Sequence, residues 1–165
     1  MNRGICRRSS FAARAQGGTV TDPNNPIVKL CAQGMEAEST GDLAGAKACF
    51  EQAWDRASDD WEKCVAAHYL ARHQSTPEAT LQWNEECLRH VDLVGDDSVA
   101  GFYPSLYLNI GHSHEVLGKK QQAIDAYRCA EGLLDSLPPG PYADMVRDGV
   151  TRGLARVSCP SHAGP

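Results

Sequence analysis

The stretch YLNIGHSHEVLGKKQQAIDAYRCA, residues 107–130, decides the fold, because its pattern occurs a second time in the chain. Residues 30–53, LCAQGMEAESTGDLAGAKACFEQA, carry the same pattern 77 positions earlier. The shared positions are a large residue, two glycines and a small–aromatic–small triplet: Leu30, Gly34, Gly41, Ala46, Phe50 and Ala53, matched by Tyr107, Gly111, Gly118, Ala123, Tyr127 and Ala130. Self-similarity at a fixed spacing is typical of repeat architectures.

The spacing within each copy predicts two antiparallel helices. A large residue, a small residue four positions later and a glycine seven further on describe one helix and the turn that ends it. Small and aromatic residues at intervals of four and three describe the side of a second helix that approaches the first closely. Each copy is therefore predicted to be a helical hairpin, and such hairpins stack.

Apolar periodicity and helix-breaking residues extend this prediction to the rest of the chain. We expect helices over about 26–40, 43–57, 60–72, 77–94, 99–117, 121–137 and 141–157. Strand signals are nearly absent, so the expected fold is all-α, with three hairpins and one last helix. Residues 1–24 are predicted to be a disordered extension, 25–157 the helical domain and 158–165 a tail.

Composition excludes several classes of function. The formal net charge of −5 combines a local charge of +3 in residues 1–24 with 12 basic and 20 acidic residues in 25–165. An acidic body argues against nucleic-acid binding, which needs clustered Lys and Arg. Seven cysteines without a regular framework favour a reducing compartment. No apolar run is long enough to span a membrane, and Arg7-Arg8 is not followed by the apolar core of an export signal, so we predict a cytoplasmic protein.

Residues 107–130 resemble the tetratricopeptide repeat signature, through Tyr107, Ile110-Gly111, Gly118 and the Ala123–Tyr127–Ala130 triplet. The first hairpin resembles it less closely, and the middle one keeps only small residues and Trp83. The resemblance covers about residues 26–137. It implies a right-handed superhelical stack of antiparallel helix pairs whose first helices line a concave groove. Residues 141–157 would then be the capping helix that such arrays need.

The register of that resemblance implies a partner-binding groove on the first helix of each pair. Its polar members would orient a partner, and Val28, Met35 and Leu108 would provide apolar contact. Asn109 matches the asparagine with which family members hold a peptide backbone. The predicted groove residues are Val28, Met35, His68, Arg72, Leu108, Asn109, His112 and Glu115.

We therefore predict a non-enzymatic interaction or scaffold module that binds a protein or peptide in this groove. We expect neither nucleic acid nor a membrane as a partner, and a homodimer is left open. The sequence has no glycine-rich dinucleotide motif, no P-loop and no Asn-Pro-Pro-Tyr motif of adenine methyltransferases, so no cofactor and no enzymatic activity are predicted.

The cysteines and histidines of the predicted helices raise metal binding as an alternative function. Cys64 and His68 are four positions apart, which is a chelating spacing on a helix, but zinc needs three or four ligands. His112 and His114 point away from each other on a helix. We predict no metal site, and keep as alternatives a helical sensor that binds a small ligand or metal and, third, an enzyme of unrecognised type.

Overall fold

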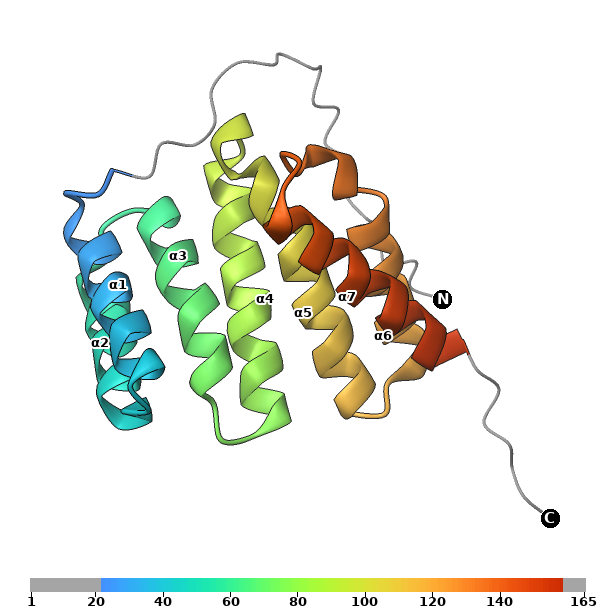
Figure 1. Cartoon of the computed structure of the whole chain (residues 1–165), viewed down its shortest axis with the longest axis horizontal. Helices are drawn as coiled ribbons and strands as arrows, with labels where there is room; N and C mark the ends of the chain where they lie inside the picture. Colours follow the sequence, from blue (N-terminus) through green and yellow to red (C-terminus); the bar gives the residue numbers. More distant parts are fainter. Residues whose placement is uncertain (1–21, 159–165) are drawn as a thin grey trace. The chain divides into compact units, whose positions relative to one another are not determined.

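The computed structural model describes residues 22–158, which form an all-helical structure (Figure 1). Its elements are α1 (Pro26–Ser39), α2 (Leu43–Arg56), α3 (Asp60–Leu70), η1 (Ala71–His73), α4 (Pro77–Val94), η2 (Asp97–Phe102), α5 (Tyr103–Val116), α6 (Lys120–Glu131), η3 (Leu134–Ser136) and α7 (Pro141–Ser158). The prediction of an all-α fold with seven helices is confirmed for the described range. Most of the predicted extension and tail lies outside it. No helix between residues 22 and 158 is long and apolar enough to cross a membrane.

The described chain divides into two compact units, residues 22–99 and residues 100–158. The first contains α1 to α4, and the second contains α5 to α7. Each unit is described by itself.

The turns of the first and third hairpins share one geometry, 77 residues apart. Gly41 and Gly118 have φ angles of +83° and +69°, the left-handed region that glycine adopts without strain. The amide of the next residue donates to the carbonyl five positions back, at 2.9 Å in both turns: Asp42 to Ala37 and Lys119 to His114. The repeated glycine therefore has the same role in both hairpins.

The helices of these two hairpins approach closely because a glycine faces an aromatic ring. A Cβ atom on Gly34 would overlap the ring of Phe50, and one on Gly111 would lie 2.6 Å from Cδ1 of Tyr127. Both rings are fully buried. The predicted pairing of α1 with α2 and of α5 with α6 is thus confirmed.

The middle hairpin, α3 with α4, is built from different residues. Asp59 caps α3 by accepting the amide of Glu62 at 2.8 Å, and Thr76 caps α4, whose first turn contains Pro77. Between the helices, the Cys87 thiol donates to the carbonyl of Cys64 at 3.0 Å, and both thiols are fully buried.

Helix α7 packs on α5 and α6 through a stripe of small residues. A Cβ on Gly149 would lie 2.9 Å from Cδ2 of Leu108, and one on Gly153 would lie 2.5 Å from Cζ of Tyr127. Ala143, Val146 and Val150 complete the buried side of α7. The Tyr127 ring is therefore held between glycines of two helices, one on α5 and one on α7.

Helix α7 has the same relation to its hairpin as α3 has to the first hairpin, with an offset of 84 residues. Tyr69 of α3 stacks on Phe50, with ring centroids 5.0 Å apart, and Gly153 lies against Tyr127. The opposite face of α7 differs from that of α3. On α3 and η1, Cys64, Ala67 and Ala71 are buried. The residues 84 positions later on α7, Asp148, Thr151 and Ala155, are exposed.

The structure corrects three predicted helix ends. The fifth helix was expected to begin near residue 99, but residues 97–102 form a 3-10 segment and α5 begins at Tyr103. Pro104 has no amide hydrogen, so it fits only the first turn of an α-helix. The sixth helix ends at Glu131 rather than near 137, and the third ends at Leu70, each followed by a 3-10 turn.

Candidate functional site

The predicted groove residues of the first unit lie on α1, α3 and η1. Val28 is half-buried, whereas the side chain of Met35 is 41% exposed. His68 is mostly buried, and Arg72 is exposed. Of these four, Met35 and Arg72 are the exposed residues.

Arg72 is held by a glutamate that the sequence did not single out. Its Nη2 atom donates to both carboxylate oxygens of Glu38, at 2.8 and 3.1 Å. The Nε2 atom of His73 lies 2.7 Å from one of these oxygens. The guanidinium of Arg72 also lies 5.0 Å from the centroid of the Tyr69 ring. The contact between Glu38 and Arg72 joins α1 to η1, directly after α3.

The predicted groove residues of the second unit all lie on α5, in different environments. Leu108 packs against α6 and α7, so it contributes to the interior of this unit. Asn109 is half-buried, and its carbonyl accepts the Ser113 hydroxyl at 2.9 Å. The His112 side chain is 65% exposed, and its Nδ1 atom lies 4.0 Å from the carboxylate of Glu115.

Glu115 connects three helices of the second unit. It accepts the phenol of Tyr127 at 2.5 Å, the Nε of Arg156 at 2.6 Å and the Nη2 of Arg156 at 2.9 Å. The guanidinium of Arg156, together with the Tyr127 hydroxyl, holds the pKa of Glu115 below its usual value. Burial and the adjacent carboxylate raise the pKa of Tyr127, so the phenol stays protonated and donates.

These two contacts are equivalent. Glu38 and Glu115 are separated by the 77-residue offset of the hairpins, and Arg72 and Arg156 by the 84-residue offset of α3 and α7. In each unit, a glutamate on the first helix of the hairpin, α1 or α5, binds an arginine that follows the hairpin. Arg72 lies in η1, directly after α3, and Arg156 lies near the end of α7. We call this arrangement the Glu–Arg clamp. Three positions before each glutamate, on the same helical face, lies a strongly exposed residue, Met35 or His112.

His68 and Cys64 lie in surroundings that favour their neutral forms. Burial and the nearby Arg72 lower the pKa of His68 to about 4, and its Nδ1 atom is buried without a hydrogen-bond partner within residues 22–158. Burial, with Asp59 and Asp60 nearby, raises the pKa of Cys64 to about 12, and the thiol donates to the Trp61 carbonyl. A protonated thiol is a poor nucleophile and a poor metal ligand. In the described part of the chain, no three His, Cys, Asp or Glu side chains are placed to hold a metal ion.

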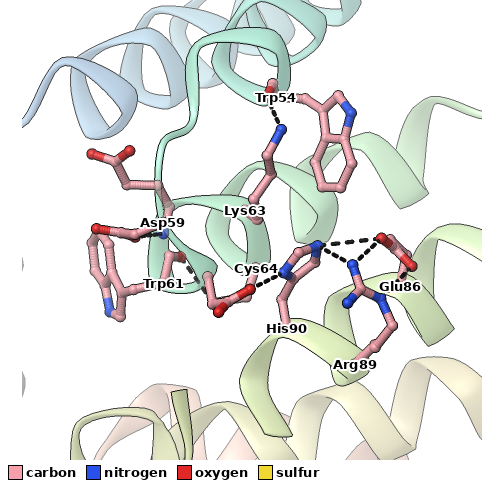
Figure 2. A network of polar contacts seen from close by, with 10 residues as sticks. Trp54, Asp59, Trp61, Lys63, Cys64, Glu86, Arg89 and His90 are labelled. Carbon is pink, nitrogen blue, oxygen red and sulfur yellow. Dashed lines mark hydrogen bonds and ion pairs between the residues drawn. The ribbon is translucent and has the colours of Figure 1, made fainter. Parts of the chain in front are cut away.

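A network of polar contacts on α3 and α4 was not anticipated from the sequence (Figure 2). Asp60 lies 2.6 Å from Nδ1 of His90, and Arg89 donates to Nε2 at 2.7 Å. Because a carboxylate only accepts, His90 donates from Nδ1 to Asp60, and its Nε2 atom also lies 3.2 Å from Glu86. Glu86 accepts two further bonds from Arg89, at 2.7 and 3.0 Å.

This network fixes α4 against the start of α3. The His90 side chain is only 8% exposed, and its ring lies edge-on to Trp54, with centroids 5.6 Å apart. Arg89 lowers the pKa of Glu86 by hydrogen bonding to it. The spacing of Glu86, Arg89 and His90 on one helix is a signal that the sequence offers, but the pairing with Asp60 depends on tertiary contact.

The chain was also compared with known proteins. Neither a scan against protein-family models nor a search of curated proteins found a match.

Proposed function

We propose that this protein is a non-enzymatic, tetratricopeptide-like interaction module that binds a protein or peptide partner along its first helices. The observation that carries the proposal is the Glu–Arg clamp, present once in each unit beside an exposed residue on the same helical face. Met35 marks this position on α1 and His112 marks it on α5. The proposal assigns each unit its own contact residues: Val28, Met35 and Arg72 in the first, and Asn109, His112 and Arg156 in the second.

The clamp supports this function because it pre-orders the arginines. Arg72 and Arg156 remain 46% and 51% exposed while two hydrogen bonds fix each guanidinium. A side chain that is already ordered loses less conformational entropy when it binds. Arginine is also among the residues that most often carry interface energy. We leave Leu108 out of the surface, because it packs between helices of its own unit.

The experiment targets the exposed pair. Met35→Glu and His112→Glu, introduced together, change charge and shape at two exposed positions of the first helices. Wild-type and double-variant proteins are used as bait in the source cells, and the captured proteins are quantified by mass spectrometry. We expect at least one protein to be captured by the wild type and lost, by tenfold or more, from the variant.

Leu43→Glu is the matched control, because Leu43 is 62% exposed and lies on α2, which is a second helix of its hairpin. It is expected to retain the same captured protein. All variants are melted by circular dichroism to exclude unfolding. If the double variant captures the same proteins as the wild type at an unchanged melting temperature, the first helices are not the partner surface.

A further inference from the structure

The glutamate of each Glu–Arg clamp has a polar contact in addition to those with its arginine, and the additional group differs between the units. In the second unit it is the phenol of Tyr127, on α6, which donates to Glu115. The equivalent residue of the first unit, Phe50, has no hydroxyl. There, the Nε2 atom of His73 lies 2.7 Å from Oε1 of Glu38. The first clamp therefore takes its additional donor from a different position.

The position of His73 shows the converse exchange. The 84-residue offset that relates α3 to α7 places Val157 at this position in the second unit. The ring of His73 has its centroid 5.1 Å from that of Phe50, and Val157 shares a buried cluster with Tyr127. The side chain of His73 is only 8% exposed, and Val157 is buried as well. Each unit thus contains a buried pair with one polar member, which is histidine beside phenylalanine in the first and tyrosine beside valine in the second.

The contact between His73 and Glu38 requires a hydrogen atom on Nε2. A carboxylate only accepts, so an imidazole nitrogen 2.7 Å from one of its oxygens must be the donor. Hydrogen bonds to a charged acceptor are stronger than those between neutral groups. The same oxygen, Oε1 of Glu38, also accepts the longer of the two bonds from Arg72, at 3.1 Å. The imidazole and the guanidinium therefore hold the same carboxylate.

We propose that His73 is a positioning residue of the first clamp, and that its Nε2–H replaces the Tyr127 hydroxyl of the second clamp. It acts through Glu38: because the imidazole holds the carboxylate, the guanidinium of Arg72 has a fixed acceptor. An arginine that is ordered in this way loses less conformational entropy when it binds a partner. This last step rests on the proposed function, whereas the exchange of donors between the units does not.

The position of the hydrogen is tested on the protein alone. Two-bond 1H–15N correlation spectra at pH 8, assigned with a His73→Gln variant, show which ring nitrogen of His73 carries it. We expect a hydrogen on Nε2. A bare Nε2, with the hydrogen on Nδ1 only, would overturn the proposal.

The exchange of donors is tested by transferring the pair of the second unit into the first. The readout is the 1H–15N heteronuclear NOE of the Arg72 Nε–H group, which falls as the guanidinium becomes mobile. His73→Val alone should lower it, and Phe50→Tyr with His73→Val should restore it, because the new phenol donates to Glu38. His73→Gln keeps an N–H donor and should lower the NOE less than His73→Val. Arg156 belongs to the other unit, so its NOE is the internal control and should not change.

The reverse exchange is made in the second unit. Tyr127→Phe should lower the NOE of the Arg156 Nε–H group, and Tyr127→Phe with Val157→His should raise it again. Circular dichroism shows whether each variant is folded, and His73→Leu replaces His73→Val if the latter is not.

The proposal is overturned if the apolar substitution of His73 leaves the Arg72 signal unchanged, or if neither exchanged pair recovers the NOE that the single substitution lost. These signals require no partner. A failure of the capture experiment with Met35→Glu and His112→Glu would therefore refute the partner surface alone.

Discussion

The first and third hairpins pack their two helices in the same way, but the helix that follows each hairpin packs differently. Both place a glycine of the first helix against a buried ring of the second, Phe50 or Tyr127. The following helix then contacts that ring differently: α3 adds a stacked ring, Tyr69, whereas α7 adds no side chain at Gly153. The Tyr127 hydroxyl, which Phe50 lacks, donates to Glu115. The two hairpins therefore share the glycine–ring contact and differ in what the following helix adds to it.

The largest expected effect comes from placing leucine at the two corresponding positions, Tyr69 of α3 and Gly153 of α7. Gly153→Leu would force a side chain into the buried Tyr127 ring, at a cost of about 3 kcal/mol in the free energy of unfolding, the upper part of the overpacking range. Tyr69→Leu removes a stacked ring but keeps a large apolar side chain, at a cost of about 1 kcal/mol. Urea denaturation followed by circular dichroism measures both. Equal costs would contradict the difference in packing around the two rings.

The Tyr127 hydroxyl is the next largest difference between the hairpins. Tyr127→Phe gives the third hairpin the ring of the first and removes one hydrogen bond to the charged Glu115, which we expect to cost about 1.5 kcal/mol. Tyr142→Phe is the matched control, because this tyrosine is 49% exposed, and it should change stability by less than about 0.5 kcal/mol. The midpoints of urea denaturation measure both effects. If Tyr127→Phe leaves stability unchanged, the hydrogen bonds from Arg156 are sufficient for the Glu115 carboxylate.

Acid should weaken the second unit through Glu115. Its pKa is lower in the folded chain than in the unfolded one, so its contribution is complete above the unfolded pKa and disappears as the pH falls through the folded value. Between pH 7 and pH 3 we expect the melting temperature of the wild type to fall more steeply than that of Glu115→Gln. Glu131→Gln, an exposed substitution on α6, should keep the wild-type slope. Parallel curves for wild type and Glu115→Gln would contradict this role.

The smallest expected effect concerns the arginines of the two clamps. Arg72→Lys and Arg156→Lys keep the charge but lose the two-bond geometry, and exposed ion pairs contribute only about 0.2–1 kcal/mol. We therefore expect each substitution to lower the free energy of unfolding by less than about 1 kcal/mol, and by similar amounts in the two units. A much larger loss at one position would show that the clamps are not equivalent.

The sequence predicted the hairpins well because their decisive contacts are local. Gly34 and Phe50 are 16 residues apart, as are Gly111 and Tyr127, so both partners fall within one 24-residue pattern. The helix ends were predicted less accurately. A 3-10 segment precedes Pro104, and apolar periodicity does not distinguish such a segment from the start of an α-helix. The correspondence of α3 and α7 was missed, because Tyr69 and Gly153 share no property visible in the sequence.

The candidate site was only partly predictable. Arg72 and Glu115 were singled out from the repeat register, but their partners lie 34 and 41 residues away on other elements. No local spacing connects Glu38 with Arg72, or Glu115 with Arg156. The Asp60–His90 pair, 30 residues apart, was missed for the same reason. Long-range polar pairs depend on how helices are rotated when they pack, and the apolar pattern alone does not fix that rotation.

The polar face of α7 limits the ways in which this chain can be extended by design. A helical stack to which another hairpin is added needs an apolar, small-residue surface on its last helix, as α3 provides where its buried Cys64 meets Cys87 of α4. At Asp148 and Thr151, α7 offers water-binding groups instead. Appending a helix after α7 would therefore require rewriting those two positions as small apolar residues first. The same two substitutions without an added helix would leave an exposed apolar surface on α7, and the protein would then self-associate.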